Sequence, residues 1–303
     1  MSTRLRGSRA ALMGFGKTEM NAINVDTRVL ARLHPQRNGR GLNIYNPYFR
    51  ETNANAIYAL FHNSDPKKLI QGLRSLGLPG AVVAGSFESD PTVPTLLDEL
   101  HPVSEEVGVV GMVAFENEKL WGAYQGGFGL RDAIERICPD FRQRKLVIIG
   151  AGTVVHALLK VLQTDSTESP RIRIFNRTVE RAENLAAKFA AVESVLPLAE
   201  LAASAEGEIL INATSIGSPW NVGDSYHFSE ALLSRFSYVV DVTFVPLETQ
   251  LTTDAARLGL NVSPGHQMFL HQAKFVLRET LGLSMNESVF ERLMLADFST
   301  NWS

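Results

Sequence analysis

Hydrophobic and polar residues alternate along most of this chain in two patterns. Short apolar runs rich in β-branched residues, typical of strands buried in a sheet, recur at residues 27–33, 56–61, 80–84, 145–149, 172–175, 208–212 and 238–242. Apolar residues spaced three and four apart, typical of helices with one buried face, occur at residues 45–51, 66–76, 93–99, 130–137, 153–162, 179–189, 229–233, 249–258 and 267–281. Residues 109–115 and 120–124 have the pattern of a hairpin. Because strands alternate with helices and no repeat is visible, the sequence predicts an α/β fold.

Residues 145–178 join two of these strands through one helix. The first strand is followed by Gly150-Ala151-Gly152, and the second stops at Asn176-Arg177-Thr178. This order is typical of the unit that binds dinucleotide pyrophosphate, because the glycines let the backbone approach the phosphates and the helix N-terminus presents free N–H groups. The alternative is an ordinary βαβ unit without a ligand, and Val155, in place of the usual third glycine or alanine, departs from the pattern.

The residues after the second strand favour NADP over NAD. An NAD site usually carries an acidic residue there, which binds the ribose 2′-hydroxyl, whereas this chain has Asn176 followed by Arg177. Arginine is a permanently charged, forked donor that matches a 2′-phosphate. We therefore predict NADP as the cofactor.

Composition narrows the class of protein. The 303 residues suffice for two domains, and the hydrophobic and charged contents of 45% and 20% are ordinary for a globular protein. A net charge of −3 gives no reason to expect nucleic acid or a membrane as partner. The single cysteine, Cys138, suits a reducing compartment, and neither a membrane-spanning run nor a signal peptide is evident. We expect a cytoplasmic protein without a metal site, monomeric or homodimeric, that binds a small molecule.

The order of motifs resembles the shikimate and quinate dehydrogenase family over nearly the whole chain after about residue 27. The resemblance rests on residues 55–76 with Gly80-Ala81, the two motifs of residues 150–152 and 176–178 with Arg181-Ala182, residues 211–217, Asp241 with Pro246 and Thr249, and residues 265–268 with Gln272-Ala273. It implies a substrate-binding α/β domain (residues 25–122), a Rossmann-type doubly wound NADP domain (123–262) and C-terminal helices that return to the first domain (263–303), with a cleft between the domains. Residues 1–24 would form an N-terminal extension.

The cofactor site of the family is retained in this sequence. By resemblance, the pyrophosphate would face Gly150, Ala151, Gly152, Thr153 and Val154, the adenosine ribose and 2′-phosphate would face Asn176, Arg177, Thr178 and Arg181, and Thr214 and Ser215 would lie beneath the cofactor. For Arg181, a solvated charge on a helix surface is an equal alternative.

The substrate site of the family is not retained. Its carboxylate-binding Ser-x-Ser falls on Arg32-Leu33-His34, its catalytic Lys on Glu88, and its catalytic Asp on Gly126 or Gly127 within the segment that begins at Tyr124. Its Asn-Thr pair falls on Gly111-Met112 and a later Tyr on Phe244, so that only Gln272 remains of the usual substrate contacts. The alternatives are a solvated strand end for Arg32 and His34, and a surface loop for Glu88. His266 and His271 are expected to have helix-surface or packing roles.

Three hypotheses follow. The first is an NADP-dependent oxidoreductase for a small hydroxy acid or polyol acid other than shikimate, with Arg32, His34, Tyr124 and Gln272 as substrate contacts. Glu88, the candidate catalytic residue, is weighed against His34 and Tyr124 as the group that transfers a proton. The second is a non-catalytic NADP-binding sensor or regulator. The third, a shikimate 3-dehydrogenase, rests on analogy of fold. The persistence of Gln272 and of the two-domain frame favours an enzyme.

Overall fold

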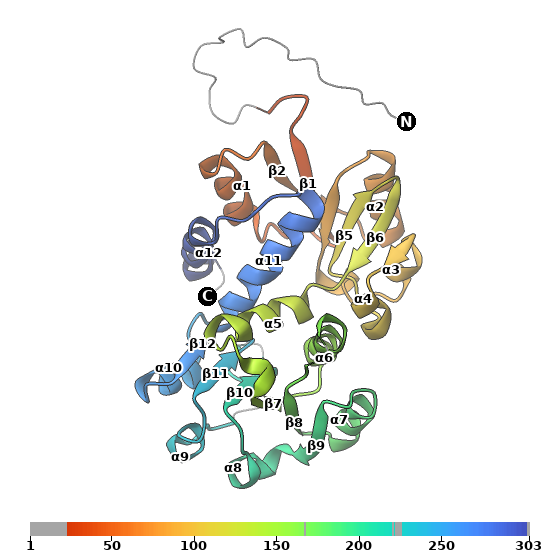
Figure 1. Ribbon diagram of the computed structural model, residues 1–303. Helices are drawn as coiled ribbons and strands as arrows, with labels where there is room; N and C mark the ends of the chain where they lie inside the picture. The colour runs from red at the N-terminus through yellow and green to blue at the C-terminus, as the bar shows by residue number, and fades with distance from the viewer. Residues whose placement is uncertain (1–22, 167, 220, 222–225, 302–303) are drawn as a thin grey trace, which may run out of the picture.

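Two six-stranded sheets make up the computed structural model, which describes residues 23–166, 168–219, 221 and 226–301 (Figure 1). In spatial order the first sheet contains β2 (Ala56–His62), β1 (Arg28–His34), β3 (Gly80–Val83), β5 (Met112–Glu116), β6 (Lys119–Ala123) and β4 (Glu99–Leu100). The second contains β12 (Asn261–Ser263), β11 (Tyr238–Asp241), β10 (Ile209–Asn212), β7 (Lys145–Ile149), β8 (Arg171–Asn176) and β9 (Val192–Pro197). The expected N-terminal extension lies almost wholly outside the described residues.

The second sheet is parallel throughout and doubly wound. Its strand order changes direction between β7 and β10, and the register aligns Ile149 at the end of β7 with Phe175 on one side and Asn212 on the other. The first sheet is parallel around β1, whereas β5 runs antiparallel to both β3 and β6. The predicted α/β class is therefore confirmed. The domain boundaries remain a prediction.

Helices cover both sheets. They are α1 (Leu42–Glu51), α2 (Pro66–Ser75), α3 (Thr92–Thr95), α4 (Pro102–Val107), α5 (Gly126–Ile137), α6 (Thr153–Asp165), α7 (Val179–Ala186), α8 (Leu201–Ser204), α9 (Glu230–Leu233), α10 (Gln250–Arg257), α11 (Gly265–Leu281) and α12 (Glu287–Asn301). Local sequence explains where several begin. At α2 the carboxylate of Asp65 accepts a hydrogen bond from the backbone N–H of Lys67, and Pro66 takes the first helical position, where no N–H is needed.

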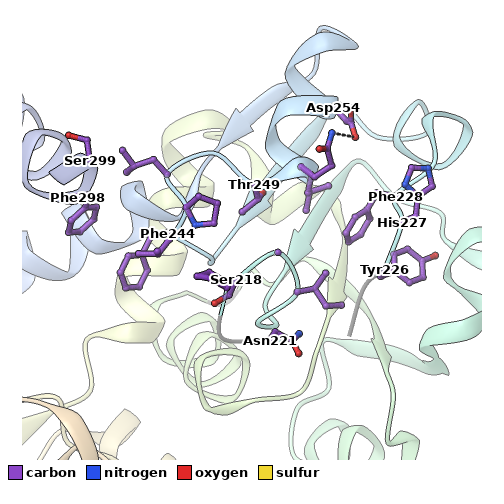
Figure 2. Close-up of a pocket in the computed structure, with 18 residues that line it drawn as sticks. Ser218, Asn221, Tyr226, His227, Phe228, Phe244, Thr249, Asp254, Phe298 and Ser299 are labelled. Atoms are coloured by element: carbon purple, nitrogen blue, oxygen red, sulfur yellow. Dashed lines mark hydrogen bonds between the residues drawn. The ribbon is translucent and has the colours of Figure 1, made fainter. Parts of the chain in front are cut away.

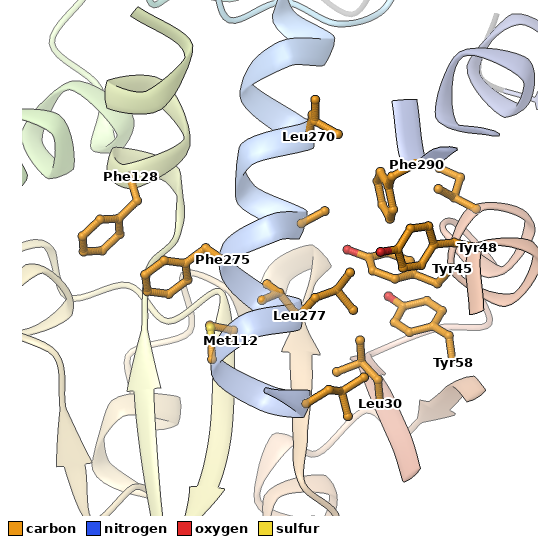
Figure 3. Packing of buried hydrophobic residues seen from close by; sticks show 14 of the residues in the cluster. Leu30, Tyr45, Tyr48, Tyr58, Met112, Phe128, Leu270, Phe275, Leu277 and Phe290 are labelled. Carbon is orange, nitrogen blue, oxygen red and sulfur yellow. The ribbon is translucent and has the colours of Figure 1, made fainter. Parts of the chain in front are cut away.

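Helix α11 connects the two halves of the molecule. It packs against α5 and against β3 and β5, and α5 in turn packs against α6 (Figure 1). Figure 3 shows Leu270 and Leu277 of α11 facing a cluster of aromatic rings from α1, β2 and α12, while Phe275 stacks on Phe128 of α5 with ring centroids 4.6 Å apart. Burial of these rings fixes α11, and with it Gln272, relative to the first sheet.

The sequence prediction was wrong at several short elements. The helix expected at residues 93–99 covers only Thr92–Thr95, because the backbone N–H and C=O of Leu120 pair with the side chain and backbone of Asp98 and turn the chain into the edge strand β4. Helix α4 and the strands β9 and β12 were missed. They are short or lie at a sheet edge, where polar residues interrupt the apolar pattern. Helix α5 begins at Gly126, four residues earlier than expected.

Candidate active site

A cavity of about 300 Å³ lies at the carboxyl edge of the second sheet, where β7, β8 and β10 end. Seven of the residues predicted to bind the cofactor line it: Gly150, Asn176, Arg177, Thr178, Arg181, Thr214 and Ser215. The other four (Ala151, Gly152, Thr153 and Val154) do not line this cavity but follow Gly150 at the start of α6. The structure thus brings the loops after three neighbouring strands to one place, as expected for a dinucleotide site.

Gly150 fixes the geometry of this edge. Its backbone φ of +106° is one that residues with a side chain rarely adopt, and a Cβ at this position would lie 2.9 Å from the carbonyl oxygen of Ala213. Its N–H donates to the carbonyl of Phe175 at 2.8 Å. Asn176 shapes the neighbouring loop, because its side-chain amide donates to the carbonyl of Thr178 at 2.7 Å.

The loop after β10 is held by a side-chain network that the sequence analysis did not identify. The amide of Asn212 donates to the carbonyl of Ile216 at 3.2 Å and to the carboxylate of Asp241 at 3.0 Å, while its oxygen accepts from the hydroxyl of Thr214 at 2.7 Å. The hydroxyl of Thr249 donates to the other oxygen of Asp241 at 2.7 Å. Burial raises the pKa of Asp241 to about 6, although these hydrogen bonds oppose the shift. The network orients the loop of Thr214 and Ser215 toward the cavity.

A second cavity of about 870 Å³ adjoins the first, since Ile216, Asn221 and Tyr226 line both. Figure 2 shows Phe244 and Phe298 on one side of it, with Tyr226 and Phe228 on the other. Phe269 packs against Phe244 and Phe298 with ring centroids 6.1 and 5.3 Å apart. Phe269 also lines a third, smaller cavity.

The smaller cavity, about 60 Å³, lies beside the first sheet and is called the polar chamber below. Its lining residues are Arg32, Arg40, Gly41, Tyr45, Tyr58, Val82, Gln125, Phe269, Gln272, Ala273 and Val276. Of the predicted substrate contacts, only Arg32 and Gln272 line it. Tyr45, Tyr58 and Gln125 were not predicted from the sequence. The two tyrosines occupy positions with the apolar pattern of a core, and that pattern does not show where their hydroxyls point.

Arg32 is the central charge of the polar chamber. It is hydrogen-bonded to Tyr58, and its Nε is buried without a hydrogen-bond partner among the described residues. Its positive charge lowers the pKa of Glu88, which burial raises. It also lowers the pKa of His34, which burial lowers as well. The alternative of a solvated strand end is therefore wrong for His34, which is 7% exposed, whereas Arg32 is half-buried.

Three glycines leave space that three large polar side chains fill. A Cβ at Gly85 would lie 2.6 Å from Nε2 of His34, and a Cβ at Gly126 would lie 2.6 Å from the hydroxyl of Tyr124. A Cβ at Gly111 would lie 2.8 Å from Cδ of Gln125. A side chain at any of these glycines would collide with the group now present. His34, Tyr124 and Gln125 thus occupy the space that side chains at positions 85, 126 and 111 would take.

Gly126 and Gly127 face different neighbours. A Cβ at Gly127 would lie 2.6 Å from the backbone of Ala157 in α6, so position 127 faces a helix, whereas position 126 faces Tyr124. The phenol of Tyr124 occupies the space that a side chain at position 126 would take.

Glu88 follows the 3-10 turn η1 (Gly85–Phe87) and is partly buried, so it is not a surface loop carboxylate. Burial raises the pKa of Glu88 to about 7, although the charge of Arg32 opposes the shift. Tyr124 is partly buried as well. Its pKa is raised by burial and then by the charge of Glu88, so its hydroxyl stays protonated. Burial lowers the pKa of His34, with Arg32 and Arg40 adding to the effect, and the ring is neutral at pH 7.

Two residues considered in the sequence belong to packing. His271 is 6% exposed, and His266 is mostly buried with Nε2 3.9 Å from a carboxylate oxygen of Glu291. No group of three or more potential metal-ligating side chains occurs within the described ranges. None of the helices in those ranges has the length and apolar character to span a membrane.

Replacing Gly150 and Gly152 with alanine is expected to separate folding from cofactor binding. Gly150→Ala should lower the free energy of unfolding by about 1–3 kcal/mol, since its φ is positive and its Cβ has no room. Gly152 has an extended backbone with φ −85°, and no atom lies within 4 Å of a Cβ built there. Gly152→Ala should therefore keep stability within about 0.5 kcal/mol but weaken dinucleotide binding, because the methyl group enters space reserved for the pyrophosphate. Urea unfolding and NADPH titration measure the two effects, and equal stabilities for the two variants would contradict this account.

Comparison with known proteins agrees with the geometry. Residues 132–249 match the profile of the family "Shikimate / quinate 5-dehydrogenase". The NADP(+) shikimate dehydrogenase of Thermococcus kodakarensis is 30% identical over 270 residues, which cover 88% of this chain and 94% of that protein.

Two solved structures have the same fold. A shikimate dehydrogenase in complex with NADP+ superimposes with a TM-score of 0.74 at 26% identity, covering 93% of this chain and 99% of the other. A shikimate 5-dehydrogenase-like protein superimposes with a TM-score of 0.79 at 23% identity, covering 92% of this chain and 100% of the other, and this likeness concerns the fold alone.

Proposed function

This chain belongs to the shikimate/quinate dehydrogenase family, and from that premise we propose that it is an NADP-dependent oxidoreductase acting on a carboxylate-bearing hydroxy compound other than shikimate. The observation that carries the proposal is Glu88, a partly buried carboxyl group with a pKa of about 7 beside the charge of Arg32. A group that titrates near neutral pH can accept and return a proton, which a non-catalytic NADP sensor would not need.

The preference for NADP rests on the cavity at the carboxyl edge of the second sheet. Arg177 and Arg181 line it, and Asn176 stands where an acidic residue would repel a 2′-phosphate. Relatives agree with this choice, since the Thermococcus kodakarensis protein is named as NADP(+)-dependent and one matching structure contains NADP+. We propose that Arg177 binds the 2′-phosphate, with Arg181 as a second contact.

Glu88 would accept the proton of the reacting hydroxyl group, and Tyr124 would donate a hydrogen bond to its oxygen. Bound NADP+ supplies the hydride acceptor. As the hydride leaves the alcohol carbon, the hydroxyl proton passes to the carboxylate of Glu88, which is then neutral and does not repel the oxygen. The protonated phenol of Tyr124, standing over Gly126, donates a hydrogen bond that stabilises negative charge on that oxygen. In the reverse direction the protonated Glu88 returns its proton to the alkoxide.

The substitutions on the substrate side argue against shikimate itself. By the resemblance, the family positions for Lys and Asp hold Glu88 and Gly126 or Gly127, and the space beside Gly111 is filled by Gln125. A polyol bound here would leave hydroxyl groups without the partners that the family provides, at a cost of about 1–3 kcal/mol for each unpaired group.

Turnover by the purified full chain tests the proposal. With NADP+ and a panel of hydroxy acids and polyols that includes shikimate and quinate, we expect NADPH formation with at least one hydroxy acid and a lower kcat/KM for shikimate. If NADPH binds but no compound is turned over, the non-catalytic alternative is correct. If shikimate gives the highest kcat/KM, the protein is a shikimate 3-dehydrogenase and the interpretation of Glu88 and Gly126 is wrong.

A further inference from the structure

The size of the polar chamber limits what can bind in it. Its volume is about 60 Å³, and a cavity needs about 10–15 Å³ of this kind of volume for each water molecule. The chamber therefore has room for a group of roughly four to six non-hydrogen atoms. Phe269, one of its lining residues, packs against Phe244 and Phe298 with ring centroids 6.1 and 5.3 Å apart.

Charge in and around the chamber selects an anion. Arg32 and Arg40 line it, and no carboxylate is among its lining residues. Burial lowers the pKa of His34, so its ring is uncharged at pH 7, and burial raises the pKa of Glu88 to about 7. The neighbouring tyrosines, Tyr45 and Tyr58, are neutral, since burial raises the pKa of each. The chamber is therefore net positive.

Two unpaired polar atoms indicate how a ligand is oriented. Nε of Arg32 is a buried donor and Oε1 of Gln125 is a buried acceptor, and neither has a hydrogen-bond partner among the described residues. Gln125 is 8% exposed, and its amide nitrogen faces the carbonyl of Gly111 at 3.4 Å. A buried polar group left unpaired is unfavourable, so a ligand that supplies an anionic oxygen to Arg32 and a hydroxyl to Gln125 would satisfy both.

We propose that the polar chamber binds a small acyclic 2-hydroxy or 2-oxo monocarboxylate, with the carboxylate against Arg32 and the 2-oxygen between Gln125 and Gln272. This inference rests on the proposed function and specifies its substrate class. Oxidation would convert the 2-hydroxy acid and NADP+ to the 2-oxo acid, NADPH and a proton, with the C2 hydride passing to NADP+. Compounds of this size, such as lactate and pyruvate, fill the chamber, whereas the ring of shikimate exceeds it.

Calorimetric binding with non-reacting pairs tests the inference without requiring turnover. Lactate is titrated into the full chain saturated with NADPH, and pyruvate into the chain saturated with NADP+. Lactamide, shikimate and inorganic phosphate are titrated in the same way. We expect lactate to bind at least about 10-fold more tightly than lactamide, its neutral isostere, because the charged pair with Arg32 is lost in the amide. Shikimate and phosphate should bind more weakly than lactate.

Arg32→Met and Arg37→Met form a matched pair of variants. Both remove a guanidinium group, but Arg37 is exposed and contacts His62, outside the chamber. Arg32→Met should weaken lactate binding by about 10- to 100-fold and leave NADPH binding unchanged, and Arg37→Met should change neither. Because the comparison of lactate with lactamide uses the unaltered protein, it remains decisive if Arg32→Met fails to fold.

The outcomes separate this inference from the proposed function. Equal binding of lactate and lactamide, tighter binding of shikimate or phosphate, or unchanged lactate binding by Arg32→Met would overturn the inference even if the protein oxidises another alcohol. Lactate binding that depends on Arg32, with no turnover of any compound in the panel, would support the chamber as a binding site and overturn the proposed oxidoreductase activity.

Discussion

Arg177→Ala is expected to weaken NADPH binding by about 10- to 100-fold and to leave NADH binding within about two-fold. Arg177 lines the cavity at the end of β8, where the adenosine ribose of a dinucleotide is expected. A hydrogen bond to a charged group contributes about 1.5–3 kcal/mol, which corresponds to this change in affinity. NADH lacks the 2′-phosphate, so it has no such interaction to lose. Titration of both nucleotides by fluorescence gives the two affinities.

Arg171→Ala is the matched control for this experiment. Arg171 is the first residue of β8, at the end opposite Arg177, and its guanidinium is 3.9 Å from the carboxylate of Glu193 at the surface. Its loss should alter neither affinity. Arg181→Ala decides between a second phosphate contact and a solvated helix charge, since only the contact predicts a loss specific to NADPH. Equal weakening of NADPH and NADH by Arg177→Ala would refute the preference for NADP.

The positions of strands that are buried along their whole length could be predicted from the sequence. The strand Lys145–Ile149 was predicted to the residue because all but its first position are fully buried, and a buried strand of a parallel sheet is apolar throughout. Strand β9 was not predicted because it lies at the sheet edge, with Glu193 exposed among its apolar residues. The length of helix α3 was overestimated because the contact that ends it, between Asp98 and Leu120, joins residues 22 positions apart. Local patterns do not contain such contacts.

The two halves of the candidate site differed in how far the sequence could predict them. The cofactor residues are contiguous in short motifs, and their backbone geometry requires glycine at position 150, so the motif itself is informative. The polar chamber combines β1, α1, β2, α11 and the segment after β6, whose lining residues are far apart along the chain. Tyr124 fills the space beside Gly126, and Gln125 fills the space beside Gly111. These contacts could not be predicted from the spacing of residues in the sequence.

Glu88→Gln is expected to lower the turnover number of any accepted substrate by about 100-fold or more, because a positioned acid or base contributes about 10²–10⁴ to the rate. The pH profile is a stricter test. In the unaltered protein, oxidation should accelerate as the pH rises through about 7, where Glu88 loses its proton, and reduction should slow over the same range. The variant should lose both dependences. Glu135→Gln, an exposed change on α5, serves as the control and should leave rates and profiles unchanged.

The same substitution should stabilise the protein at alkaline pH. The pKa of Glu88 rises from an ordinary 4.5 to about 7 on folding, so the folded state holds a proton that the unfolded state has released between these values. Ionisation of Glu88 therefore opposes folding, and the free energy of unfolding falls as the pH rises from about 4.5 through 7. Glu88→Gln removes this cost, which amounts to at most about 3 kcal/mol above pH 7 and vanishes near pH 4.

Urea unfolding of the two proteins at pH 5 and pH 8 measures the difference. A gain in stability that is larger at pH 8, together with a loss of turnover, would show that the protein retains an unfavourably buried carboxylate for its chemistry. A gain in stability without any turnover to lose would show that the burial of Glu88 serves another purpose, such as ligand binding in a non-catalytic protein. No gain at pH 8 would mean that Glu88 is ionised at neutral pH in the folded state, and the proposed proton transfer would lose its basis.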